Sequence, residues 1–145
     1  MEKIIVSSCL LGNNTKYNGK NNYISDIELL KDIYEIIPIC PEVMGGLSIP
    51  RIPSEVRGNM VIDKEGNDVT KYYIIGMNKT LDIVNKYNIK IAILKDGSPS
   101  CGNSLIYDGT FSGNKINGFG LTAKELSKLG VRIYNENNFK ELLKC

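Results

Sequence analysis

The sequence contains neither histidine nor tryptophan. Without histidine, the chain cannot build a Ser-His-Asp triad, a Cys-His nucleophile pair or a zinc site that needs imidazole. An excess of charge of one sign is lacking too, because 18 basic and 16 acidic residues give a net charge of +2. With no run of like charges either, the sequence gives no indication of binding to nucleic acid or to an anionic membrane.

Long hydrophobic runs are also absent. No apolar stretch approaches the ~20 residues of a transmembrane helix. The apolar segment before Cys9 covers only residues 4–6, whereas an export signal needs roughly 7–15 apolar residues. We therefore expect a cytoplasmic protein that does not associate with a membrane. Its four cysteines are then expected to be thiols rather than disulfides.

The length and composition are those of one soluble domain. The chain has 145 residues, of which 42% are hydrophobic and 23% are charged, so it can bury a core without disulfides. The sequence shows no internal repeat and no composition shift that would mark a boundary. We expect residues 1–145 to form a single domain.

Short runs rich in Ile and Val predict buried strands at residues 3–7, 35–40, 90–94 and 131–134. Continuous apolar runs of this kind suit a sheet that is covered on both faces. Helical patterns lie between these runs, at residues 25–34, 72–87, 122–130 and 138–144. The alternation predicts an α/β fold: a Rossmann-like domain with a mainly parallel sheet flanked by helices.

The helical segments carry further local signals. Ser25 and Thr122 each begin a capping-box pattern, and Gly130 is placed to end the third helix. In the second helix, one face is expected to carry Ile74, Met77, Leu81 and Val84.

Two irregular stretches interrupt the alternation. Residues 41–59 form a long loop, and after it residues 60–63 and 68–70 flank a turn at 64–67. This pattern predicts a small β-hairpin insertion. Residues 102–120 are rich in Gly and Asn and are a candidate for a second hairpin.

The positions of three cysteines are the most informative feature of the chain. Cys9 follows the first predicted strand, Cys40 ends the second and Cys101 follows the third. Ligands of open α/β sheets bind beyond the carboxyl ends of the strands, so the three thiols are expected at one edge of the sheet. Two interpretations remain open: ordinary buried cysteines, or thiolate ligands of a metal centre that leaves one coordination position free.

Polar side chains accompany these thiols. Glu42 is two residues from Cys40, while Ser98 and Ser100 precede Cys101. A carboxylate in a partly dry pocket is suited to proton transfer. The alternatives are that Glu42 lies at a helix start or in solvent, and that the serines serve the turn around Pro99.

Several motifs, in order along almost the whole chain, resemble the DUF523 family, whose characterised members include the thiouracil desulfurases. They are Ser7-Ser8-Cys9-Leu10-Leu11-Gly12, Cys40-Pro41-Glu42, Gly45-Gly46-Leu47, Pro50-Arg51 and Ser98-Pro99-Ser100-Cys101-Gly102. One segment departs from the family pattern. Residues 16–19 read Lys-Tyr-Asn-Gly, where family members often have Arg-Tyr-Asp-Gly, and we assign this segment no role.

The resemblance implies a [4Fe-4S] cluster held by Cys9, Cys40 and Cys101. It also implies Glu42 and Ser98 as catalytic residues, with Ser100 and Arg51 as candidates for substrate contact. Cys145 matches no ligand of the family and is interpreted as a spare thiol near the C-terminus.

The function that the resemblance implies is non-redox desulfuration of a thiolated pyrimidine such as 2-thiouracil, which yields uracil and hydrogen sulfide. The expected partner is thus a small thiolated nucleobase. Nucleic acid is not expected because no basic patch is evident, and the chain is a monomer or a homodimer. The alternatives are desulfuration of thiouridine in a nucleoside or RNA, and a non-catalytic iron-sulfur or sulfur-carrier protein.

Overall fold

The structure is a computed structural model and describes residues 1–144. Its main sheet is parallel and has the strand order β2-β1-β5-β8. The strands are β1 (Glu2–Ser7), β2 (Tyr34–Ile39), β5 (Ile91–Ile93) and β8 (Arg132–Tyr134). All four lie where the Ile- and Val-rich runs predict them. Together with the helices described below, they confirm the Rossmann-like α/β fold class.

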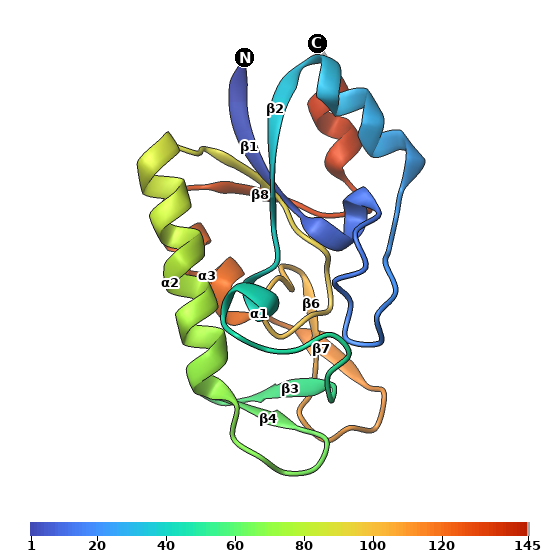
Figure 1. Ribbon diagram of the computed structural model, residues 1–145, viewed down its shortest axis with the longest axis vertical. Coiled ribbons are helices and arrows are strands. Elements are labelled where there is room, and N and C mark those ends of the chain that lie inside the picture. The colour runs from blue at the N-terminus through green and yellow to red at the C-terminus, as the bar shows by residue number, and fades with distance from the viewer. Residues whose placement is uncertain (145) are drawn as a thin grey trace.

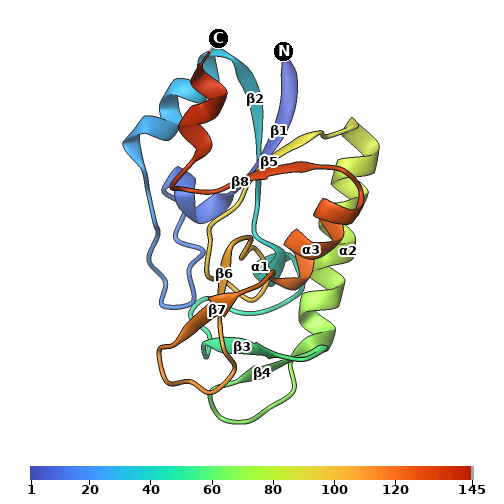
Figure 2. The same cartoon turned by 180° about the vertical axis from the view of Figure 1, so that it is seen from behind.

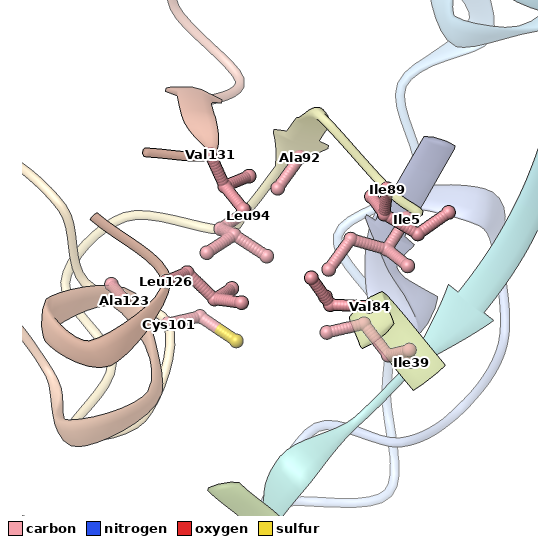
Figure 3. Close-up of a cluster of buried hydrophobic side chains, with 10 residues drawn as sticks. All are labelled: Ile5, Ile39, Val84, Ile89, Ala92, Leu94, Cys101, Ala123, Leu126 and Val131. Atoms are coloured by element: carbon pink, nitrogen blue, oxygen red, sulfur yellow. The ribbon is translucent and has the colours of Figure 1, made fainter. Parts of the chain in front are cut away.

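Helices cover both faces of this sheet (Figures 1 and 2). One face carries α2 (Thr70–Tyr87) and α3 (Leu121–Lys128), and the other carries the 3-10 helices η1 (Ser8–Leu11), η2 (Ser25–Asp32) and η3 (Phe139–Leu143). Because successive strand residues point to opposite faces, Ile5 packs with Val84 and Leu126, as Figure 3 shows. Ile4 and Val6 pack on the other side, with Ile27 and Phe139.

The predicted capping boxes are wrong. The residues that precede η2 and α3 are Ile24 and Gly120, and neither makes a side-chain cap. At α3, the N–H groups of Leu121 and Ala123 instead donate to the carbonyls of Pro99 and Ser100. A loop from elsewhere in the chain thus satisfies the free N–H groups of the helix start. Segment 25–34 is a 3-10 helix over Ser25–Asp32, and segment 138–144 is one over Phe139–Leu143.

Helix α2 is where the sequence predicts it, but its buried face is rotated. The buried residues are Tyr73, Gly76, Thr80 and Val84, whereas Ile74 is 42% exposed. The cause is the short helix α1 (Pro41–Met44), which packs against α2. A Cβ atom on Gly76 would lie 1.7 Å from the carbonyl oxygen of Pro41. Close backbone contact therefore selects the face with the glycine.

Two hairpins lie beyond the carboxyl ends of the sheet strands, at the end of the molecule opposite the termini (Figure 1). The first pairs β3 (Ser54–Arg57) with β4 (Met60–Asp63). The predicted pairing of 60–63 with 68–70 is present in part, as an antiparallel bridge between Ile62 and Asp68 and a hydrogen bond from the Val69 N–H to the Val61 carbonyl oxygen. Residues 68–70 also serve the start of α2, where Asp68 accepts from the Thr70 backbone N–H. The second hairpin, β6 (Leu105–Tyr107) with β7 (Lys115–Asn117), lies within the predicted region.

Within residues 1–144, no helix combines the length and the apolar character needed to cross a membrane.

Candidate active site

A cavity of about 560 Å³ is lined by residues at the carboxyl ends of β1 and β2, by the loop after β5 and by residues of both hairpins. Cys9 enters it from η1 directly after β1, Cys40 from the residue that follows β2, and Cys101 from the loop after β5. The fold therefore brings the three thiols to one cavity. The other residues singled out in the sequence also line it: Glu42, Arg51, Ser98 and Ser100.

All three thiols are free and largely withdrawn from solvent. Burial raises the pKa of each of them, and it raises that of Cys101 to about 12. Hydrogen-bond donors oppose this effect. The Asn22 amide nitrogen lies 3.4 Å from Cys9 Sγ, and the Ser100 hydroxyl lies 3.7 Å from Cys101 Sγ. The protein thus supplies hydrogen-bond donors to these sulfur atoms. A bound cation would offset the effect of burial on their pKa and hold them as thiolates.

Three thiols are the candidate metal ligands of this cavity. A structural zinc site and a fully ligated iron-sulfur cluster each take four protein ligands. Three thiolates would therefore leave one coordination position of a metal centre free, and a substrate can bind at such a position. The donor set fits an iron-sulfur cluster with one iron free of protein ligands.

Glu42 is held by three side chains. Its Oε1 accepts from Arg51 Nε at 3.1 Å and from the Tyr73 hydroxyl at 3.1 Å. Its Oε2 accepts from the Ser100 hydroxyl at 3.0 Å. The ion pair with Arg51 is well buried, since the two side chains are 7% and 12% exposed. The carboxylate is therefore fixed in position at the wall of the cavity, and Oε2 carries one donor fewer than Oε1.

Local sequence explains the position of Glu42. It lies in the first turn of α1, where Pro41 is favoured because its missing N–H has no helical partner. Gly45 ends α1 against α2, and a Cβ atom there would lie 1.9 Å from the carbonyl oxygen of Tyr72. The two glycine contacts seat α1 on α2 and thereby bring Glu42 to Tyr73.

The loop that carries Cys101 is ordered by Ser98 and Asp96. Ser98 Oγ accepts from the backbone N–H groups of Ser100 and Cys101 and lies 3.1 Å from Ser100 Oγ. Asp96 Oδ1 accepts four backbone N–H groups, from Gly97, Asn103, Ser104 and Leu105. Burial favours a higher pKa for Asp96, but these donors outweigh it, and the pKa is lowered. An ionised anchor therefore fixes the loop on which Ser98, Ser100 and Cys101 lie.

Among the residues that sequence reasoning missed at this site are Tyr73 and Thr15. Burial and the neighbouring charge of Glu42 raise the pKa of Tyr73, so its hydroxyl keeps the proton that it donates. The small residues Gly76 and Thr80 lie at helical spacing from Tyr73 and could have indicated that face as buried. Thr15 lines the cavity, and its buried hydroxyl oxygen has no hydrogen-bond partner among the described residues. We found no sequence signal for Thr15.

Arg51 is occupied by protein groups on every side of its guanidinium. Besides Glu42, it donates to the carbonyl oxygens of Thr15 at 2.9 Å and Ser48 at 3.3 Å. Its backbone N–H also donates to the carbonyl oxygen of Tyr17. Arg51 therefore ties the segment around residues 15–17 to α1. Cys145 lies outside the described residues.

Comparisons with known proteins point to one family. A family model described as 2-thiouracil desulfurase matches residues 4–138. The uncharacterised protein YbbK of Bacillus subtilis strain 168 is 41% identical, and the match covers 97% of this chain and 99% of that protein. A solved structure, described as the [4Fe-4S]-dependent thiouracil desulfidase TudS, is 39% identical with a TM-score of 0.94. That match covers 99% of this chain and 96% of the other.

Proposed function

The chain belongs to the 2-thiouracil desulfurase family, and from that premise we propose that it desulfurates a thiolated pyrimidine such as 2-thiouracil. The observation that carries the proposal is the convergence of three thiols and the fixed carboxylate of Glu42 on one cavity. The reaction exchanges sulfur for oxygen. A bond from water oxygen to the ring carbon forms, the carbon–sulfur bond breaks, and both protons of water leave with the sulfur as hydrogen sulfide. No oxidant or reductant is consumed.

We assign Cys9, Cys40 and Cys101 as the ligands of a [4Fe-4S] cluster. Such a cluster, with one iron free of protein ligands, supplies a Lewis acid for the sulfur of the substrate. The protein would hold the cluster from three separate segments, which follow β1, β2 and β5. The Asn22 amide lies where it can donate to the Cys9 thiolate and so stabilise it. The single proton of the Ser100 hydroxyl goes to Glu42 Oε2 at 3.0 Å rather than to Cys101 Sγ at 3.7 Å.

Glu42 is assigned as the general base and acid. Its Oε2 accepts one hydrogen bond, while its Oε1 accepts two, so Oε2 is the oxygen with room for a proton. Glu42 takes a proton from the attacking water there and returns it to the departing sulfur. Arg51 and Tyr73 keep the carboxylate oriented during both transfers, since both donate to the other oxygen.

The two serines receive different roles. Ser98 Oγ already accepts from two backbone N–H groups, so we assign it the task of holding Ser100 and Cys101 in place. Ser100 donates to Glu42 and is therefore the hydroxyl closer to proton transfer and substrate. We assign Arg51 to orienting Glu42 rather than to direct substrate contact, because its guanidinium donates to Glu42 and to the carbonyl oxygens of Ser48 and Thr15.

The deciding experiment is an anaerobic assay of the iron-reconstituted protein with 2-thiouracil. We expect repeated turnover, with sulfide and uracil released in equal amounts. A sulfur-carrier protein would instead release at most one sulfide per chain and no further product. Parallel reactions with thiouridine and with thiolated RNA report the substrate class. The proposal fails if 2-thiouracil is not converted although iron and cluster absorbance are present.

A further inference from the structure

Phe111 has a backbone conformation that phenylalanine rarely adopts. It lies at the tip of the β6–β7 hairpin with a φ of 57°. A bulky residue in this left-handed region is strained, and such strain persists only where the surroundings impose it. Glycine would be the unstrained choice, and Gly109 and Gly113 on either side do adopt positive φ values. Phenylalanine at this position therefore carries a cost to folding.

A buried clamp on the other hairpin imposes this conformation. Glu55 of β3 is 9% exposed, and its Oε1 accepts from the backbone N–H groups of Gly109 at 2.9 Å and Phe111 at 3.2 Å. Arg57, on the same strand, donates to the carbonyl oxygen of Gly109 at 2.6 Å. Its guanidinium carbon lies 5.8 Å from the centre of the Phe111 ring. Two charged side chains of β3 thus fix one aromatic residue of the neighbouring hairpin.

Phe111 and Glu55 both line the cavity that contains the thiols. Two tyrosines, Tyr17 and Tyr107, line it as well. Neither has a positive φ value, and the two residues are 41% and 36% exposed. A fixed aromatic ring at the wall of a binding cavity is suited to stacking on a flat ring, because every pyrimidine presents a π-face.

We propose that Phe111, locked by Glu55 and Arg57, is the stacking platform that selects planar heterocycles in this cavity. The inference rests on the proposed function for the identity of the ring. It assigns ring recognition to the hairpins, whereas the sulfur chemistry belongs to the thiols and Glu42. A planar ring should then bind better than a puckered ring with the same hydrogen-bonding edge.

The test compares uracil with 5,6-dihydrouracil, which has the same carbonyl and N–H groups but lacks the planar ring. Binding to the reconstituted full-length protein is measured by calorimetry. The wild type should prefer uracil by at least about fivefold, the lower end of the effect of base–aromatic stacking. Phe111→Leu should lose this preference, and Phe111→Trp should keep it. Phe119→Leu is the matched control, because Phe119 is exposed and does not line the cavity.

Thermal unfolding of Phe111→Gly separates recognition from packing. Glycine relieves the backbone strain, so the midpoint of unfolding should stay level or rise while the preference for uracil disappears. Glu55→Ala should also reduce the preference, because the clamp is then lost. A Phe111→Gly protein with a clearly lower midpoint would show that the ring serves packing, and it would overturn the proposal.

The remaining outcomes are equally decisive. Equal binding of the two compounds by the wild type, or no binding of uracil, overturns the inference. Loss of the preference in Tyr107→Leu but not in Phe111→Leu also overturns it. Because the readout is product binding, it is independent of turnover. If the protein prefers uracil but releases no sulfide, the stacking platform stands and the proposed function is refuted. If it releases sulfide but does not prefer uracil, the proposed function stands and the stacking platform is refuted.

Discussion

At the scale of single residues, the two oxygens of Glu42 have different hydrogen-bond partners. Oε1 is occupied by Arg51 and Tyr73, whereas Oε2 has only the Ser100 hydroxyl. Glu42→Gln keeps the size of the side chain but removes its ability to exchange a proton. Turnover of 2-thiouracil should fall by about 10²–10⁴-fold, which is the usual contribution of a positioned acid or base. The variant is assayed anaerobically at equal iron content.

Glu35→Gln is the matched control for this substitution. Glu35 pairs with Lys3 at the surface, and its side chain is 57% exposed, so its neutralisation should leave turnover at the wild-type rate. A Glu42→Gln protein that releases sulfide as fast as this control would remove Glu42 from the mechanism.

Tyr73 donates to Glu42 and does not line the cavity, so we expect it to act through Glu42 rather than on the substrate. Tyr73→Phe removes one donor to the carboxylate and keeps the buried ring. We expect kcat to fall by about 10- to 150-fold with KM nearly unchanged, because a hydrogen bond to a charged group contributes roughly 1.5–3 kcal/mol. Steady-state kinetics measure both constants. Tyr87→Phe, on an exposed part of the same helix, should match the wild type, and an unchanged kcat in Tyr73→Phe would refute the positioning role.

The sequence identifies the residues that we propose carry the chemistry better than it identifies their hydrogen-bond partners. Cys9, Cys40, Cys101, Glu42 and both serines stand in local motifs, and the fold brings all of them to one cavity. Tyr73 is 31 residues from Glu42 along the chain, and no local motif connects the two. The division of roles between Ser98 and Ser100 likewise depends on which hydroxyl faces α1, which the sequence does not record.

At the scale of elements, the contact between α1 and α2 decides where Glu42 lies. Gly76 meets the backbone of Pro41 so closely that any Cβ atom would force the helices apart. Gly76→Ala should therefore lower the free energy of unfolding by about 1–3 kcal/mol, as overpacking commonly does. It should also slow turnover, because Glu42 moves away from Tyr73. Urea unfolding and sulfide release check the two effects.

Asn78→Ala is the control on the same helix. Asn78 is exposed, and alanine is the better helix former, so its stability should match or slightly exceed that of the wild type. If Gly76→Ala were as stable and as active as Asn78→Ala, the glycine contact would not be what positions Glu42.

Element types follow from the sequence more reliably than element boundaries and partners. The strands of the main sheet are visible as short apolar runs because both faces of the sheet are buried. The start of α3 is not visible, since its first N–H groups donate to the distant carbonyls of Pro99 and Ser100. The first hairpin shows the same limit. The strand β4 pairs with β3, the strand that precedes it in the chain, while residues 68–70 contribute to the beginning of α2.

At the scale of the whole molecule, the strand topology brings the residues of the site together. Parallel strands deliver Cys9 and Cys40 to the same edge of the sheet, and the loop after β5 delivers Cys101. This convergence is predictable because it needs only the strand order and the direction of the chain. The closure of the cavity by two hairpins is not predictable from local patterns, since it depends on contacts such as those of Glu55 with Gly109 and Phe111.

The most direct test of a three-cysteine cluster is the iron content of anaerobically reconstituted protein. The wild type should hold about four irons per chain with the absorbance of a [4Fe-4S] cluster. Cys9→Ala, Cys40→Ala and Cys101→Ala should each lose that cluster, and Cys145→Ala should keep it. Full iron content in any of the first three variants, or loss of iron in Cys145→Ala alone, would contradict the account.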